Sequence, residues 1–162
     1  MTTAQNSGSE SAGRESMSLK AFSYFAARVV IVHTVTFFIA GWIALALQWG
    51  GIYGGEAVQF YLRDPNSQYV QTWLIPAEIL RGILLAIAFY PFLGRIMEMK
   101  RWGWLAVASA YLLIGEIGIG TIENIVYTNL PASFLLSTVP EAVLEALLFG
   151  YFLILWQRRA KT

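Results

Sequence analysis

Residues 29–49 read VVIVHTVTFFIAGWIALALQW, a continuous apolar stretch whose one ionisable side chain is a histidine. A helix of about 20 apolar residues spans the hydrocarbon core of a bilayer, which is about 30 Å thick. Apolar helices in the cores of soluble proteins are usually shorter and carry a polar face. The stretch therefore predicts a transmembrane helix, and it decides the class of fold.

Three further stretches meet the same length criterion, namely residues 73–94, 104–127 and 132–156. Of the 162 residues in the chain, 57% are hydrophobic and 13% are charged, which lies outside the usual composition of soluble proteins. We therefore predict an all-α protein, a four-helix transmembrane bundle whose membrane domain covers residues 19–157.

The segments outside the predicted spans are more polar. Residues 1–18 are rich in Ser, Gly and Thr, and we expect them to form a disordered cytoplasmic head. Residues 19–28 either extend the first helix or lie on the membrane surface, and we favour the extension. Residues 158–162 are expected to form a short basic cytoplasmic tail.

Basic residues are distributed unevenly along the chain, although the formal net charge is only +1. One side of the predicted bundle has a single basic residue, Arg63. Because cytoplasmic segments are enriched in Lys and Arg, we predict that both termini are cytoplasmic and that the protein resides in the inner (plasma) membrane. This topology also explains the basic clusters, so we expect no nucleic-acid partner. The basic residues assigned to the cytoplasmic side are Arg14, Lys20, Arg28, Arg95, Lys100, Arg101, Arg158, Arg159 and Lys161.

Polar side chains inside the predicted spans are candidates for a functional site, because charged groups are costly at bilayer depth and face protein or water. Residues three, four or seven positions apart share a helix face, so each of the last three spans has one polar stripe. From helical rise, we expect the stripes to converge on the outer half of the bundle, with Glu78 near the outer boundary and Glu145 near the midplane. The candidate ligand-binding or proton-binding residues are Glu78, Arg81, Glu116, Glu123, Asn124, Glu141 and Glu145.

Five glutamates and one arginine would share this pocket. Arg81 can satisfy one or two carboxylates through its guanidinium group. The other carboxylates must then be protonated, hydrated or matched by a bound cation. Such a pocket is suited to exchanging protons or to binding a small cation, whereas the alternative is a polar network that only fixes the helices relative to one another.

His33 is the only histidine, and the chain has no cysteine. Carboxylate metal sites in four-helix bundles use Glu-x-x-His pairs, which this sequence lacks, and we find no phosphate-binding or nucleotide-binding motif. We therefore expect no metal and no cofactor. Helical rise places His33 in the inner third of its span, about 10 Å or more in depth from Glu116. We expect the ring to bond Thr34, Thr36 or a backbone carbonyl, and a haem or pigment ligand is the alternative left open.

Four short motifs carry a resemblance to a known group. They are LRGILLAIAFYPF (80–92), GWL (103–105), IENIVYTNLP (122–131) and PEAVLEALLFGYFL (140–153). Together they resemble a group of small bacterial four-span integral membrane proteins with no assigned activity, and the resemblance covers residues 73–156. It implies a recurring pattern without a substrate, and Glu116, Glu145 and His33 are not part of that pattern. The pattern comprises Arg81, Gly82, Glu123, Tyr127, Pro131 and Glu141.

Three classes of function are consistent with these residues. The first is the binding or passage of a small cationic or protonatable ligand, or of protons, with the glutamates carrying charge and Arg81 as counter-ion. Because four helices are few for a complete transporter, this class predicts a homo-oligomer in the lipid bilayer. The alternative is an accessory or assembly subunit of a larger membrane complex. The third is a membrane-embedded enzyme that uses carboxylate acid/base chemistry, for which we assign no catalytic residue.

Overall fold

The computed structural model describes residues 19–47, 67–116 and 136–160. Every regular element within these residues is helical, in agreement with the predicted all-α class. The elements are α1 (Leu19–Ala46), α3 (Gln68–Phe89), the 3-10 turn η2 (Tyr90–Phe92), α4 (Leu93–Glu98), the 3-10 turn η3 (Lys100–Trp102), α5 (Gly103–Tyr111), the π-helical turn η4 (Leu112–Glu116) and α8 (Val139–Arg159).

Three helical segments are long and apolar enough to cross a membrane. They are α1, the continuous segment Gln68–Glu98 that contains α3 and α4, and α8. The predicted span at residues 104–127 is described only as far as Glu116, where η4 ends. The remainder of that span and the predicted head at residues 1–18 lie outside the described residues.

The helices begin earlier or later than the predicted spans, and local sequence explains part of the difference. α1 includes residues 19–28, so the extension that we favoured is confirmed. α3 begins at Gln68, ahead of the predicted start at residue 73, and Ser67 caps it. The side-chain oxygen of Ser67 accepts a hydrogen bond from the backbone N–H of Val70 at 3.4 Å, which satisfies one of the unpaired donors of the first turn.

Prolines mark one end of α3 and one end of α8. Pro91 lies in η2 directly after α3, where a residue without an N–H interrupts the α-helical ladder. Pro140 lies in the first turn of α8, where no intrahelical N–H bond is lost. Arg158 and Arg159 form the last turn of α8, so the basic tail predicted at residues 158–162 begins inside the helix. Basic side chains there interact favourably with the helix dipole.

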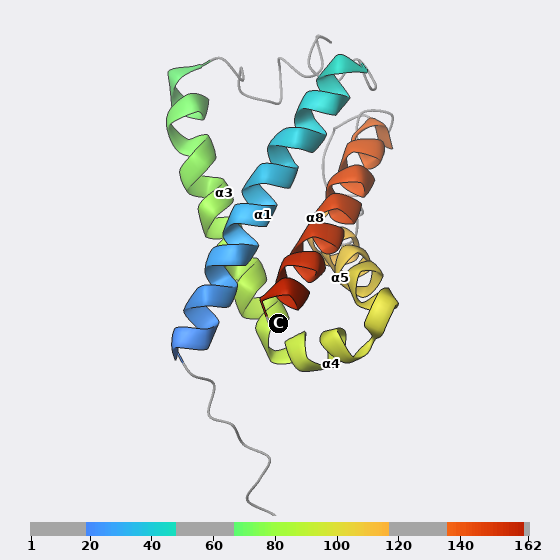
Figure 1. The fold of residues 1–162 in the computed structure, drawn as a ribbon. Coiled ribbons are helices and arrows are strands. Elements are labelled where there is room, and N and C mark those ends of the chain that lie inside the picture. Colours follow the sequence, from blue (N-terminus) through green and yellow to red (C-terminus); the bar gives the residue numbers. More distant parts are fainter. Residues whose placement is uncertain (1–18, 48–66, 117–135, 161–162) are drawn as a thin grey trace, which may run out of the picture.

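The four main helices form a bundle in which α1 lies between α3 and α8, and α5 packs against α8 (Figure 1). The start of α1, the short helix α4 and the end of α8 lie at one end of the molecule, which we call the basal end (Figure 1). The end of α1 and the starts of α3 and α8 lie at the opposite, distal end. The described chain therefore begins and finishes at the same end of the bundle.

Two glycines bring neighbouring helices into close contact. A Cβ atom on Gly82 of α3 would lie 2.8 Å from the Cα atom of Val30 of α1. A Cβ atom on Gly150 of α8 would collide with the backbone carbonyl oxygen of Trp104 of α5. Membrane helices commonly use small residues at such interfaces, because close backbone approach increases van der Waals contact.

Apolar and aromatic side chains fill the basal half of the bundle. The ring centroids of Phe89, on α3, and Phe149, on α8, lie 6.2 Å apart, so these two rings pack against each other in the core. Nearer the basal end, the guanidinium of Arg28 donates a hydrogen bond of 2.8 Å to Gln157 Oε1, which links α1 to α8. The buried apolar residues of this region include Phe25, Val29, Phe89, Val107, Phe149, Leu153 and Ile154.

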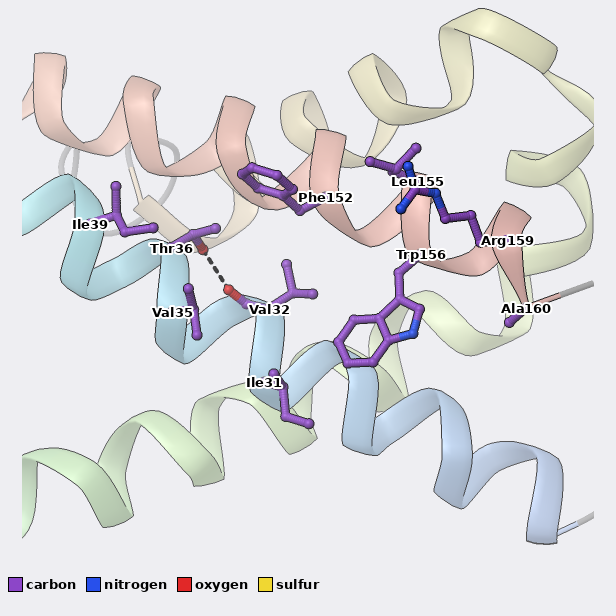
Figure 2. Close-up of a pocket in the computed structure, with 10 residues that line it drawn as sticks. All are labelled: Ile31, Val32, Val35, Thr36, Ile39, Phe152, Leu155, Trp156, Arg159 and Ala160. Carbon is purple, nitrogen blue, oxygen red and sulfur yellow. Dashed lines mark hydrogen bonds between the residues drawn. The ribbon is translucent and has the colours of Figure 1, made fainter.

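An apolar groove of about 630 Å³ follows the outside of the α1–α8 pair (Figure 2). Its α1 wall includes Ile31, Val35 and Ile39, and its α8 wall includes Phe152 and Trp156. The groove reaches Arg159 at the basal end of α8.

Candidate functional site

His33 lies on the buried face of α1, and its side chain is fully enclosed. That face is a stripe at helical spacing that includes Val29, His33, Thr36 and Ala40. The Thr36 hydroxyl donates to the backbone carbonyl oxygens of Val32, at 2.9 Å, and His33, at 3.1 Å. The prediction that Thr34, Thr36 or a backbone carbonyl bonds the imidazole ring is therefore wrong, because the Thr34 hydroxyl has no hydrogen-bond partner among the described residues and carboxylates from other helices contact the ring.

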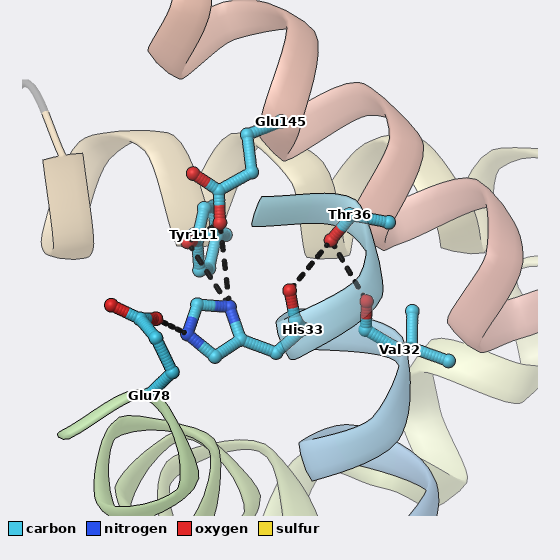
Figure 3. A network of polar contacts seen from close by, with 6 residues as sticks. All are labelled: Val32, His33, Thr36, Glu78, Tyr111 and Glu145. Atoms are coloured by element: carbon cyan, nitrogen blue, oxygen red, sulfur yellow. Dashed lines mark hydrogen bonds and ion pairs between the residues drawn. The ribbon is translucent and has the colours of Figure 1, made fainter. Parts of the chain in front are cut away.

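Two glutamates contact opposite sides of the His33 ring (Figure 3). Glu78 of α3 places Oε2 2.8 Å from Nε2, in an orientation that makes an ion pair without hydrogen-bond alignment. Glu145 of α8 places Oε1 3.4 Å from Nδ1. Both glutamates are buried, so the ring is held between two carboxylates inside the bundle.

Tyr111 of α5 completes this arrangement. Its hydroxyl donates a hydrogen bond of 2.6 Å to Glu145 Oε1 and lies 3.4 Å from Nδ1 of His33. Its ring packs against Phe149, with the centroids 4.9 Å apart, and the guanidinium carbon of Arg81 lies 5.7 Å from the Tyr111 ring centroid. The ring is thus fixed by packing, while the hydroxyl orients the Glu145 carboxylate.

One polar side chain from each of the four main helices therefore meets at a single buried point. We call these four residues the His33 cluster: His33, Glu78, Tyr111 and Glu145 (Figure 3). The glycine contacts of the fold explain how the helices come close enough. Gly82 lies one turn after Glu78 on α3, and Gly150 lets α8 approach α5, which carries Tyr111.

A polar cavity of about 180 Å³ lies beside the cluster, on its distal side. Arg81, Glu141 and Glu145 contribute its charged groups, and Thr138 contributes a hydroxyl. Gly41 of α1 lies beside Glu141, since a Cβ atom on Gly41 would lie 3.5 Å from Glu141 Oε1, an ordinary van der Waals contact. A cavity with polar walls of this kind can hold water molecules or a small cation.

Two relative depths differ from the prediction. Glu78 was placed near the outer boundary and Glu145 near the midplane, but both contact the ring of His33. His33 was placed about 10 Å or more in depth from Glu116, whose predicted level near the midplane Glu145 shared. In the structure His33 lies at the level of Glu145.

No family model, no curated protein and no solved structure matches this chain.

The other predicted site residues divide into two groups. Arg81 and Glu141 line the polar cavity together with Glu145, as the predicted convergence of spans requires. Glu116 is placed only as the last residue of η4. Glu123 and Asn124 lie outside the described residues, so their predicted place in the pocket stays a prediction.

The contacts of the imidazole ring bear on the net charge of the site. Each ring nitrogen lies within ion-pair distance of a carboxylate oxygen, at 2.8 Å for Glu78 and 3.4 Å for Glu145. The hydroxyl proton of Tyr111 is used in its shorter contact, the one to Glu145. If two protons are shared by His33, Glu78 and Glu145, these three groups together carry one negative charge.

Those two protons can be arranged in more than one way. Either His33 is an imidazolium between two carboxylates, or the ring is neutral and one glutamate is protonated. Both arrangements have the same net charge, and in both the imidazole ring lies between Glu145 and Glu78.

The cluster also bears on the haem alternative. An axial ligand to haem needs an imidazole nitrogen directed at the iron, and both nitrogens of His33 are directed at carboxylates. This arrangement argues against that use of His33. Among the described residues, no three His, Asp or Glu side chains are grouped so as to hold a metal ion.

Sequence reasoning missed the roles of His33 and Tyr111. A usable signal for His33 was the spacing of Val29, His33, Thr36 and Ala40, because a stripe of small and polar residues on an apolar helix indicates a helix interface. Tyr111 gave a weaker signal. It follows Val107 by one turn on the buried face of α5, a position that by itself predicts packing and no polar contact.

Proposed function

We propose that the chain forms a four-span bundle in the inner (plasma) membrane, with both termini in the cytoplasm. Residues 103–116 rise about 20 Å as a helix, and the apolar residues that follow them in the sequence are enough to complete a fourth span. The described residues at the distal end, 40–47, 67–76 and 136–140, contain no Lys or Arg. The basal end carries Lys20, Arg28, Arg95, Lys100, Arg101, Arg158 and Arg159, which supports a cytoplasmic basal end by the positive-inside rule.

We infer that the protein binds and passes protons, or a small cationic ligand that exchanges with protons, at the His33 cluster and the polar cavity. The observation that carries this proposal is the place of Glu145. Its carboxylate contacts His33 and Tyr111 inside the core and also lines the polar cavity. A proton on Glu145 is therefore coupled both to the buried ring and to whatever occupies the cavity.

The charges of the site favour a cationic occupant. With two shared protons, His33, Glu78 and Glu145 together carry one negative charge in either arrangement described above. If Arg81 is positive and Glu141 negative, the cluster and cavity as a whole keep one negative charge. A single additional proton or monovalent cation neutralises it, and burial of an unbalanced charge is strongly unfavourable.

The basal side of the cluster is closed. Phe149, which is fully buried, packs edge-on against the His33 ring with the centroids 6.1 Å apart, and Phe89 packs against Phe149. The cavity lies on the distal side, so exchange is expected to begin there. Passage to the cytoplasm requires this aromatic layer to move, and we propose that the protein acts as a homo-oligomer in which neighbouring copies support that movement.

Proton flux in proteoliposomes tests the proposal. The purified protein is reconstituted with a pH-sensitive dye inside the vesicles, and a pH gradient is imposed. We expect the wild-type protein to dissipate the gradient faster than protein-free vesicles. We expect Glu145→Gln and the double variant Glu141→Gln, Glu145→Gln to lower the flux to that of protein-free vesicles, because the amide cannot carry the shared proton.

Glu98→Gln is the matched control, because Glu98 is exposed and pairs with Arg95 at 3.2 Å far from the cluster. It should leave the flux unchanged. An unchanged flux in the Glu141→Gln, Glu145→Gln double variant would show that these carboxylates do not carry protons. The flux is measured with protons, with Na⁺ and with tetramethylammonium as the transported ion. If vesicles with the wild-type protein and protein-free vesicles gave equal fluxes for all three ions, the proposed function would be contradicted altogether.

A second candidate function is that of an accessory or assembly subunit of a larger membrane complex. The observation that favours it is an exposed apolar surface on the distal half of α1, where Phe38, Ile39, Trp42 and Ile43 line a shallow groove. Trp42 is 76% exposed, and a partner helix could cover it. This candidate predicts co-purification with unrelated subunits and no flux. The resemblance to small bacterial four-span proteins stays a prediction, and the enzyme class gains no specific support.

A further inference from the structure

The groove between α1 and α8 has a chemistry different from that of the polar cavity. It contains no residue of the His33 cluster, and the side chains along most of its length are apolar (Figure 2). The Thr36 hydroxyl reaches it but already donates to the carbonyl oxygen of Val32 at 2.9 Å. A volume of about 630 Å³ is within the range of small-molecule pockets, which is roughly 300–1,000 Å³.

The basal end of the same groove is polar and positive. Arg159 lines the groove there, and Trp156 lies beside it (Figure 2). The indole nitrogen of Trp156 is on the side of the ring that faces Ala160, so its N–H can donate a hydrogen bond near the basal end of the groove. A ligand that fits the whole groove has an apolar chain and an anionic head.

We propose that this groove binds an anionic glycerophospholipid of the cytoplasmic leaflet. One acyl chain lies along Ile31, Val35 and Phe152, and the phosphate lies near Arg159 and the indole N–H of Trp156. Basic pockets between transmembrane helices on the cytoplasmic side commonly bind anionic head groups. This inference rests on the membrane placement proposed above, and it does not depend on proton or cation transfer at the His33 cluster.

A second copy of the chain fits this face less well than a lipid does. A twofold axis along the membrane normal would place the same ends of both copies together. The Arg159 side chains of the two copies would then approach each other at one level of the membrane, and like charges there repel. An anionic head group instead complements the positive end and leaves the apolar walls covered by its chain.

Native mass spectrometry of the full-length protein in mild detergent tests the proposal. Dioleoylphosphatidylglycerol and dioleoylphosphatidylcholine are titrated separately, and the dissociation constant of the first bound lipid is measured. We expect the anionic lipid to bind more tightly, and we expect Arg159→Gln to weaken it by about fivefold, the effect of one basic residue near an anionic lipid surface. Arg158→Gln is the matched control, because Arg158 is the adjacent exposed basic residue of the same helical turn and does not line the groove.

A second variant tests the apolar part of the groove. Val35→Trp fills the groove from the α1 side, and Val35 is half-exposed there, so the substitution does not enter the core. We expect it to weaken both lipids. Equal losses in Arg159→Gln and Arg158→Gln, or equal affinity for the two lipids in the wild-type protein, would overturn the proposal. A lipid-independent dimer that Val35→Trp dissociates would assign the groove to a second copy instead.

Discussion

Replacing Gly82 with Ala tests how the close approach of α1 and α3 builds the site. The added Cβ atom would lie 2.8 Å from the Cα atom of Val30, whereas carbon atoms in ordinary contact are about 3.5–4.0 Å apart. Val30 Cα belongs to the backbone, so the two helices must separate by roughly 0.7 Å to restore contact. The same separation would lengthen the 2.8 Å contact between His33 and Glu78.

The expected free-energy change follows from two opposing effects. Overpacking of a tight interface costs about 1–3 kcal/mol, while replacing Gly by Ala in a helix contributes up to about 1 kcal/mol of stability. Gly94→Ala is the control, because a Cβ atom on Gly94 of α4 would have no neighbour within 4 Å. The helix-propensity gain is common to both variants, so their difference of about 1–3 kcal/mol measures the interface alone.

The assay is reversible unfolding in mixed micelles of a mild detergent and dodecyl sulfate. A second readout is the ¹⁵N signal of the imidazole ring, which is unambiguous because His33 is the only histidine in the chain. We expect Gly82→Ala to be the less stable variant and to shift the imidazole signal, and we expect Gly94→Ala to leave that signal unchanged. Equal stability of the two variants, with no shift of the imidazole signal, would refute the reasoning that Gly82 sets the α1–α3 distance.

Three further predictions concern single positions. Tyr111→Phe keeps the ring packing but removes the 2.6 Å hydrogen bond to Glu145. The free energy of unfolding should therefore fall by about 1–3 kcal/mol, and the ¹⁵N signal of the imidazole ring should shift. An unchanged signal would contradict the assigned contact. Gly150→Ala should lower stability and folded yield more than Gly82→Ala, because its Cβ would collide with the backbone oxygen of Trp104, and equal yields would contradict this. Lys100 has φ 47°, so Lys100→Gly should raise the midpoint of thermal unfolding by relieving about 1 kcal/mol of strain, whereas Lys100→Ala should not.

The sequence predicted much of the candidate site, but it did not predict the contacts of His33. Glu78, Arg81, Glu141 and Glu145 were identified because ionisable groups inside apolar spans are costly and are tolerated where they serve a purpose. The ring of His33 was expected to bond a threonine or a backbone carbonyl. In the structure the ring of His33 contacts Glu78 and Glu145, and Arg81 stacks over Tyr111 and lines the polar cavity.

The amino-acid sequence by itself determined the helical class and the long apolar segments. Helix is the only single-segment structure that satisfies its own backbone hydrogen bonds in a bilayer, so length and composition were enough. Local sequence also marked the ends of helices through Ser67, Pro91 and Pro140. Each of these signals depends only on a few neighbouring residues. The sequence of one segment is therefore enough to predict where its helix begins or ends.

Only the tertiary structure decided which side chains meet. His33, Glu78, Tyr111 and Glu145 lie on four different helices, and their contacts depend on how far each helix slides along its neighbour and how it is rotated about its axis. Those variables are set by close packing at glycines such as Gly82. A shift of one helical turn moves a side chain about 5.4 Å, which is more than any of these contacts tolerates. Packing of the whole bundle therefore placed the histidine between its two carboxylates.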